Sequence, residues 1–203
     1  MPTPEPADVP VFVLCGGLGP RLGEIAAMRP KPMLDIGEKP MLLHIMSCYG
    51  RFGFRRFVLC TGHRDDVISS YFTNFAALNG DYTVNLASSR VSYRERERLP
   101  DWEVTVAFTG LSTMTGARLA RAAERYLAHA EHFGVTYGDG LTDADLGEEF
   151  DFHLGHDRCG TVLGVQPPSR YGRLALQEDG SASFVEKPNR TDHTVNGGFF
   201  FRH

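Results

Sequence analysis

An apolar run followed directly by a glycine-rich loop is the feature that most constrains the fold of this chain. Residues 9–15 are mostly apolar and β-branched, which predicts a buried strand. The loop Gly16-Gly17-Leu18-Gly19-Pro20-Arg21 comes next. Glycines let a backbone approach a bulky group closely and point its N–H groups at phosphate oxygens. Arg21, and Lys31 in its Pro-Lys-Pro frame, supply fixed cations. This order predicts a site for a nucleoside triphosphate.

The glycines alone also fit an ordinary turn between a strand and a helix. No glycine follows Gly17-Leu18-Gly19 at the spacing of the dinucleotide fingerprint, and no Gly-Lys-Ser/Thr of a P-loop is present. The two cations at their spacing favour the triphosphate site over the simple turn.

Composition narrows the classes of partner. The chain has 203 residues and a net charge of -4, which argues against general nucleic-acid binding. The basic residues from Arg90 to Arg98 are interleaved with glutamates and predict a solvated segment.

The four cysteines form no CxxC pair, which argues against a metal cluster or a disulfide framework. Cys15 and Cys60 lie in apolar runs and are expected to be buried thiols in a reducing compartment.

The sequence patterns predict neither a signal peptide nor a membrane span. No apolar run reaches the roughly 18 residues of a membrane span, and the N-terminus lacks a signal-peptide pattern. We therefore expect a cytoplasmic protein that contacts no membrane. Residues 1–8 are rich in proline and are expected to be disordered, which leaves residues 9–203 as one domain.

Strand and helix signals alternate along the chain. Helical spacing of apolar residues predicts helices over 41–52, 65–75, 116–129 and 145–156. Apolar or alternating runs predict strands over 9–15, 56–61, 82–87, 102–108, 133–137, 161–165, 173–177, 182–186 and 199–201. This order predicts an α/β fold, a Rossmann-like and mostly parallel sheet with helices on both faces.

Ligands of such folds bind at the carboxyl ends of the strands. The glycine loop, Asp139 and Glu186-Lys187 all follow predicted strands, so we expect them in one cleft. Asp139, flanked by glycines, suits a Mg²⁺ ion that is also bound by substrate phosphates. An Asp-Gly turn is the alternative, but a helical pattern rather than a strand follows it.

Two further segments have polar groups suited to a sugar phosphate. Lys187 is placed to contact a phosphate and Glu186 to accept hydrogen bonds from sugar hydroxyls, although such a pair is usually a solvated turn. Asn196-Gly197 suits sugar hydroxyls or a tight turn. His153 and His156 have no carboxylate or cysteine at metal-ligand spacing and are interpreted as surface or packing residues.

Taken together, the motifs resemble those of the sugar-nucleotide nucleotidyltransferases, over about residues 11–202. The segments that carry the resemblance are Gly16 to Leu22, Pro30 to Met33, Ile36 to Pro40, Ser112 to Arg118, Thr136 to Gly140, Asp151 to His153, Glu186 to Pro188 and Asn196 to Phe200. The Met-Thr-Gly-x-Arg and Tyr-Gly-Asp-Gly segments favour the cytidylyl branch of that family.

The resemblance implies the nucleotide-diphospho-sugar transferase fold and transfer of a cytidylyl group from CTP to a sugar 1-phosphate, glucose 1-phosphate. It implies Arg21, Lys31 and Asp139 as catalytic residues, with Asp139 on Mg²⁺, and a homo-oligomer. The implied nucleotide contacts are Leu14, Cys15, Gly16, Gly17, Leu18, Gly19, Thr113, Arg118 and Gly138. The implied sugar-phosphate contacts are Gly172, Glu186, Lys187, Asn196 and Gly197.

Three features depart from the family pattern. Pro20 stands where the family has Thr, which removes a backbone N–H and a hydroxyl from the phosphate loop. Arg29 replaces a Lys and keeps the charge. The sequence ends at His203, before the family's second metal-binding Asp and last helices, so a C-terminally truncated domain is expected. Two functions stay open, a cytidylyltransferase with weakened catalysis and an inactive module that binds nucleotide or sugar phosphate.

Overall fold

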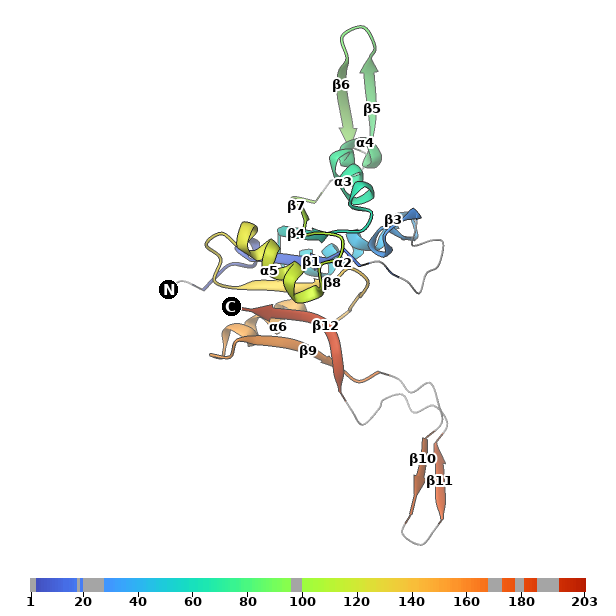
Figure 1. Ribbon diagram of the computed structural model, residues 1–203, viewed down its shortest axis with the longest axis vertical. Helices are drawn as coiled ribbons and strands as arrows, with labels where there is room; N and C mark the ends of the chain where they lie inside the picture. Colours follow the sequence, from blue (N-terminus) through green and yellow to red (C-terminus); the bar gives the residue numbers. More distant parts are fainter. Residues whose placement is uncertain are drawn as a thin grey trace.

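One mixed sheet organises the molecule in the computed structural model, which describes residues 3–17, 19, 28–95, 100–167, 173–177, 181–185 and 194–203. The central sheet has six strands in the order β7-β4-β1-β8-β12-β9 (Figure 1). Its strands are β1 (Pro10–Leu14), β4 (Arg56–Thr61), β7 (Glu103–Phe108), β8 (Phe133–Tyr137), β9 (Gly160–Val165) and β12 (Val195–Arg202). β7, β4, β1 and β8 are parallel, and β12 runs antiparallel to both β8 and β9. The predicted mostly parallel α/β sheet is confirmed.

Helices cover both faces of this sheet, as predicted. The described helices are α2 (Met41–Gly50), α3 (Asp65–Thr73), α4 (Phe75–Asn79), α5 (Thr115–Tyr126) and α6 (Leu146–Leu154). Short 3-10 turns are η1 (Pro6–Asp8) and η3 (Lys31–Met33). None of the helices in the described part of the chain is long and apolar enough to cross a membrane.

The two faces have separate cores because side chains alternate along each strand. Val11 and Val13 of β1 point to one face, where they pack with buried side chains of α2, α3 and α6. Phe12 points to the other face and packs with Ala122 of α5. Both faces of β1 are fully buried, which explains the continuous apolar run in the sequence.

Three small two-stranded sheets complete the structure: β2 (Asp35–Ile36) with β3 (Lys39–Pro40), β5 (Gly80–Asn85) with β6 (Arg90–Glu95), and β10 (Arg173–Leu176) with β11 (Ala182–Val185). The β5–β6 hairpin projects beyond α3 and α4 (Figure 1). The segment expected to be only solvated, from Arg90 to Arg98, is exposed in its described part but forms strand β6.

Several predicted boundaries shift. The helix predicted over 65–75 divides at Asn74 into α3 and α4. The octapeptide at the N-terminus, expected to be disordered, includes η1, and Arg56 donates a hydrogen bond to the Asp8 carbonyl at 2.9 Å. The strand predicted over 199–201 is longer and begins at Val195.

Candidate nucleotide-binding site

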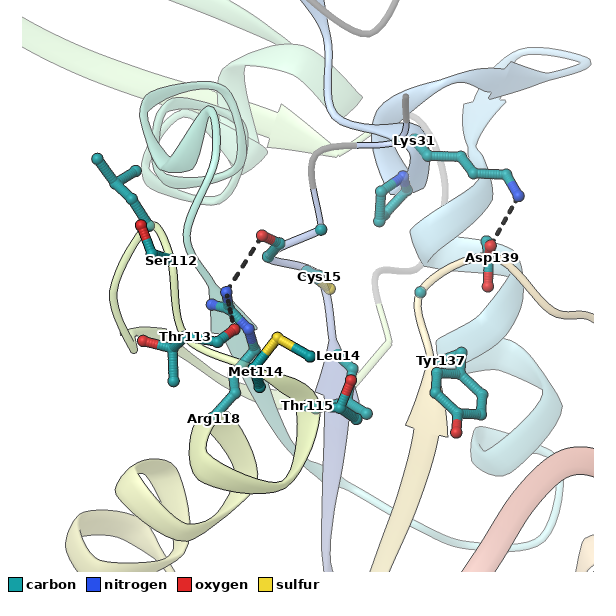
Figure 2. Close-up of a pocket in the computed structure, with 16 residues that line it drawn as sticks. Leu14, Cys15, Lys31, Ser112, Thr113, Met114, Thr115, Arg118, Tyr137 and Asp139 are labelled. Carbon is teal, nitrogen blue, oxygen red and sulfur yellow. Dashed lines mark hydrogen bonds and ion pairs between the residues drawn. The ribbon is translucent and has the colours of Figure 1, made fainter. Parts of the chain in front are cut away.

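A pocket of about 390 Å³ lies at the carboxyl ends of β1 and β8 and at the start of α5 (Figure 2). This is the edge where ligands of parallel α/β sheets bind, and the volume is that of an ordinary small-molecule site. The residues that line it are Leu14, Cys15, Gly16, Gly17, Gly19, Lys31, Pro32, Leu111, Ser112, Thr113, Met114, Thr115, Arg118, Tyr137, Gly138 and Asp139.

The glycine loop follows β1 and lines the pocket beside the loop that follows the neighbouring strand β8. The Cys15 N–H still donates to the Cys60 carbonyl at 3.0 Å, and the Gly138 N–H donates to the Leu14 carbonyl at 3.1 Å. A Cβ on Gly138 would stand 2.7 Å from the Pro32 ring and 2.9 Å from the Leu14 carbonyl oxygen. Glycine is therefore required at 138 by close packing of the two loops that frame the pocket.

Lys31 and Asp139 meet across the pocket mouth although they are far apart in sequence. The Lys31 Nζ lies 2.7 Å from an Asp139 carboxylate oxygen, and both side chains are less than half exposed. Lys31 is held by η3 between two prolines, and Asp139 follows β8. The prediction that the glycine loop and Asp139 share one cleft is confirmed. Among the described residues that line the pocket, Asp139 is the one carboxylate.

Arg118 is the buried cation on the opposite side of the pocket (Figure 2). Its Nη1 donates to the Thr61 carbonyl and to the Thr109 hydroxyl, each at 2.5 Å. Its Nη2 donates to the Gly16 carbonyl at 3.2 Å and to the Thr113 carbonyl at 3.0 Å. The guanidinium thus connects the glycine loop, the end of β4 and the segment before α5.

This clasp needs glycines beside it. A Cβ built on Gly16 would stand 2.0 Å from the Arg118 Nη1, and one on Gly62 would stand 2.7 Å from the same atom. By contrast, a Cβ on Gly17 meets no atom within 4 Å. Gly16 therefore makes room for the arginine, whereas Gly17 faces open space in the pocket.

The positive charge of Arg118 has no acidic partner among the described residues, because all four of its recorded acceptors are uncharged oxygens. Burial lowers the pKa of Arg118, yet an arginine stays charged in proteins. A buried charge without a counter-ion is costly, so the wall of the pocket attracts an anion.

The start of α5 adds to this positive potential. Thr115 is the first residue of the helix, and the preceding Met114 offers no side-chain hydrogen bond to the free N–H groups of the first turn. Such N–H groups and the helix dipole favour a negative group at this end. The Thr113 hydroxyl, predicted to contact nucleotide, donates to the Thr109 carbonyl at 2.7 Å and accepts from Arg121 at 2.8 Å.

Cys15 contributes backbone rather than thiol chemistry. Burial is the largest cause that raises the pKa of this thiol well above its usual value. A protonated, buried thiol is neither a nucleophile nor a metal ligand. Cys15, Cys48 and Cys60 are buried free thiols, as the apolar runs predicted for Cys15 and Cys60.

Five of the expected site residues lie outside the described residues, namely Leu18, Arg21, Gly172, Glu186 and Lys187. The placement of Glu186-Lys187 in the cleft therefore stays a prediction. Among the described residues, the preceding strand β11 pairs with β10 in a two-stranded sheet and not with the central sheet. Pro20 also lies outside the described residues.

Asn196 and Gly197 lie in strand β12, not in the loop that the sequence predicted, and neither is among the described lining residues. The Asn196 side chain accepts a hydrogen bond from the Gly198 N–H at 2.7 Å, beside an irregularity in the β12–β9 register. Gly198 has φ of 87°, a conformation that favours glycine. In the structure, Asn196 and Gly198 form part of the irregularity in the β12–β9 pairing.

The sequence analysis did not select several lining residues. Met114 and Leu111 are 79% and 62% exposed, and Tyr137 is 38% exposed, so apolar surface is available in the pocket. Met114 and Tyr137 lie inside the motifs at 112–118 and 136–140, and Leu111 directly precedes the first of them. Position in or beside those motifs was the signal that could have identified them.

Comparison with known proteins identifies the family. The model of the nucleotidyl transferase family matches residues 11–203. The chain belongs to the nucleotidyl transferase family. Among its relatives, the glucose-1-phosphate cytidylyltransferase of Salmonella typhi is 43% identical over 188 residues, which cover 93% of this chain and 72% of that protein. A probable glucose-1-phosphate cytidylyltransferase of Bacillus subtilis is 34% identical over the same shares.

A solved structure of another nucleotide-binding relative has the same fold. HddC from Yersinia pseudotuberculosis, in complex with GMP-PN, superposes with a TM-score of 0.60 at 26% identity, over 96% of this chain and 76% of that one. The family resemblance inferred from the motifs is confirmed, and of the two functions left open the comparisons favour the enzyme over the inactive module.

Proposed function

We propose that this chain transfers a cytidylyl group from CTP to glucose 1-phosphate and releases pyrophosphate and a CDP-sugar. One observation carries the proposal. The glycine loop, Lys31 and Asp139 converge at the carboxyl edge of the sheet, in a chain 43% identical to a glucose-1-phosphate cytidylyltransferase. The choice of CTP and glucose 1-phosphate among nucleotides and sugars rests on that relative.

The pocket has the charge distribution that a triphosphate needs. The backbone from Cys15 to Gly17 leads into it, Lys31 lies at the mouth, and the Arg118 charge and the start of α5 form the opposite wall. Charge-assisted hydrogen bonds from such groups to phosphate are about twice as strong as neutral ones. The exposed side chains of Leu111 and Met114 offer apolar surface to the base.

The residues present also fit Mg²⁺. This ion is usually held by one or two carboxylates, by water and by substrate phosphates rather than by a closed protein cage. Asp139 offers one carboxylate facing the pocket, within reach of a phosphate held by Lys31. When bound, the ion would supply positive charge that neutralises the phosphate oxygens.

The chain's own contribution is positioning. In phosphoryl and nucleotidyl transfer the protein does little covalent chemistry, so alignment of the attacking oxygen and stabilisation of charge dominate. In the proposed reaction a sugar phosphate oxygen attacks the α-phosphorus of CTP in line, and the bond to pyrophosphate breaks. Lys31, now paired with Asp139, turns to the phosphates when nucleotide binds. Arg21 joins it, and Glu186 and Lys187 hold the sugar phosphate.

Calorimetry with CTP and Mg²⁺ tests the triphosphate site. Lys31→Ala removes a cation that faces the phosphates, and we expect a loss of roughly 10- to 100-fold in affinity, since a hydrogen bond to a charged group contributes about 1.5–3 kcal/mol. Lys39→Ala is the matched control, because Lys39 is exposed and does not line the pocket. Equal affinity of both variants would show that the loop is only a turn.

A further inference from the structure

A second cluster of functional side chains lies at the opposite end of β8 from the pocket. His132 directly precedes β8, His153 lies on α6 and His203 follows β12. Since β8 has five residues, the cluster is about 16 Å along the strand from the nucleotide pocket. It plays no part in the chemistry proposed above.

The sheet register brings these residues together. Arg202 of β12 pairs with Phe133 of β8. The next residues, His203 after β12 and His132 before β8, therefore lie side by side at the ends of these two strands. The His153 ring stacks on Phe201 of β12 with centroids 6.1 Å apart, which places its imidazole under the same edge. His153 is 1% exposed, His132 is half-buried and His203 is exposed.

We propose that His132, His153 and His203 bind one divalent transition-metal ion, with Zn²⁺ as the best-matched ion. One ring nitrogen from each histidine lies within 4.8 Å of the others, and this is the one such group of metal-ligating side chains among the described residues. The His132 Nδ1 and His153 Nε2 are 3.1 Å apart and share a hydrogen bond, whose proton a metal ion would displace. Two nitrogens bound at 2.0–2.1 Å to a tetrahedral zinc lie roughly 3.3–3.4 Å apart, so little movement is needed.

An outer hydrogen bond fits this role. His153 Nδ1 lies 3.2 Å from the Thr161 hydroxyl, as is common for histidines that bind a metal through the other nitrogen. The Arg158 N–H donates to His156 Nδ1, so His156 donates from Nε2 to the same hydroxyl at 2.8 Å. The Thr161 oxygen can accept from both histidines. When both bonds are accepted at this oxygen, His153 carries its proton on Nδ1 and its Nε2 lone pair is available to a metal.

Imidazole is the commonest side-chain ligand of divalent transition metals, and it binds them through a ring nitrogen. Three imidazoles leave a fourth position at the exposed side, which water can fill.

Such an ion would connect three elements that are distant in sequence. It would join the segment between α5 and β8, the end of α6 and the end of β12. In this way it would hold strands β8 and β12 against helix α6. An ion that binds only the folded state stabilises it by mass action. We therefore assign the site a structural role.

The test is zinc binding by tag-free, chelator-treated protein in excess Mg²⁺, which masks the oxygen ligands of the nucleotide pocket. Competition with a chromophoric chelator should give one zinc per chain, and Co²⁺ should give the visible absorption of a four-coordinate site. His132→Ala and His203→Ala should each weaken zinc binding by at least about tenfold. Zinc at about a hundred times its Kd should raise the Tm of the wild type by roughly 5–10 °C.

The matched control is His129→Ala, an exposed histidine on the same segment as His132 and outside the cluster. It should bind zinc as the wild type does. The proposal is overturned if the wild type shows no saturable zinc binding, or if the His132 and His203 variants bind as tightly as the control. Circular dichroism of each variant separates loss of the site from loss of the fold.

Discussion

The buried guanidinium of Arg118 is predicted to hold the phosphate loop in place, and Arg118→Met tests this. The substitution keeps an unbranched side chain of similar reach but removes all four hydrogen bonds. The Thr61 carbonyl keeps its bonds from Thr109, whose N–H lies at 3.0 Å and whose hydroxyl lies at 2.6 Å. The Gly16 and Thr113 carbonyls lose the donor that the arginine supplied.

The magnitude follows from those two carbonyls. A buried acceptor left without a partner costs about 1–3 kcal/mol, so the buried Gly16 carbonyl and the part-buried Thr113 carbonyl together cost at most about 6 kcal/mol. Part of this free-energy cost is offset, because folding of the methionine variant does not bury the charge that the arginine carries. We expect a loss of about 2–4 kcal/mol in the free energy of unfolding, or roughly 5–15 °C in Tm for a chain of this length.

Thermal unfolding of the variant beside Arg125→Met is the assay. Arg125 is exposed on the same helix, and its bonds reach the Arg121 and Phe108 carbonyls outside the pocket, so its replacement should shift Tm far less. Arg118→Lys keeps the charge but not the fork of donors, and its Tm should stay close to that of the methionine variant. Equal Tm for wild type and Arg118→Met would refute the structural role.

Two further predictions concern a buried acid and the loop glycines. Burial raises the pKa of Glu149 to about 7, whereas an unfolded glutamate has 4.5, so the folded state keeps its proton longer and stability falls as pH rises from 4.5 through 7. Glu149→Gln should therefore gain on the wild type by up to about 3 kcal/mol between about pH 4 and pH 8 in urea unfolding; a constant difference would contradict this. Gly16→Ala should destabilise the fold, because its methyl group clashes with Arg118. Gly17→Ala should keep the Tm of the wild type but weaken CTP binding, measured by calorimetry, about tenfold or more. A loss of Tm in Gly17→Ala would show that its surroundings are not open.

The elements that the sequence predicted best are those whose burial dominates their pattern. The apolar run of β1 and the centre of β8, over residues 134–136, are buried on both faces, so composition alone indicates them. The convergence of the glycine loop and Asp139 followed from a general rule of parallel sheets, since each directly follows a strand.

What the sequence could not show depends on pairing between distant segments. Strand β6 carries arginines and glutamate, and it forms because it pairs with β5, which no local pattern reveals. Strand β11 looked like a further strand of the main sheet, yet in the part of the chain that the structure describes it pairs with β10 alone. Sequence patterns give a strand's burial but not its neighbour.

Side-chain roles set by three-dimensional contact were also out of reach. Arg118 was expected to contact nucleotide, and nothing in the sequence indicated that its guanidinium binds four backbone and hydroxyl oxygens. His153 was interpreted as a surface or packing residue because no carboxylate or cysteine lies at metal-ligand spacing from it. It is indeed packed in the interior, but its contacts with His132 and His203 join residues that are distant along the chain. Ligand spacing rules detect sites within one segment, not sites built from three.

The most direct test of the proposed function is the identity of the product. Purified chain would be incubated with CTP, glucose 1-phosphate and Mg²⁺, and the mixture followed by phosphorus NMR and mass spectrometry, with each other nucleoside triphosphate in parallel. We predict a CDP-sugar and pyrophosphate in equal amounts, with CTP preferred by at least about tenfold in kcat/KM. The Lys31→Ala variant should form only a trace of this product. Intact CTP, hydrolysis of CTP without a sugar adduct, or a clear preference for another nucleotide would contradict the account.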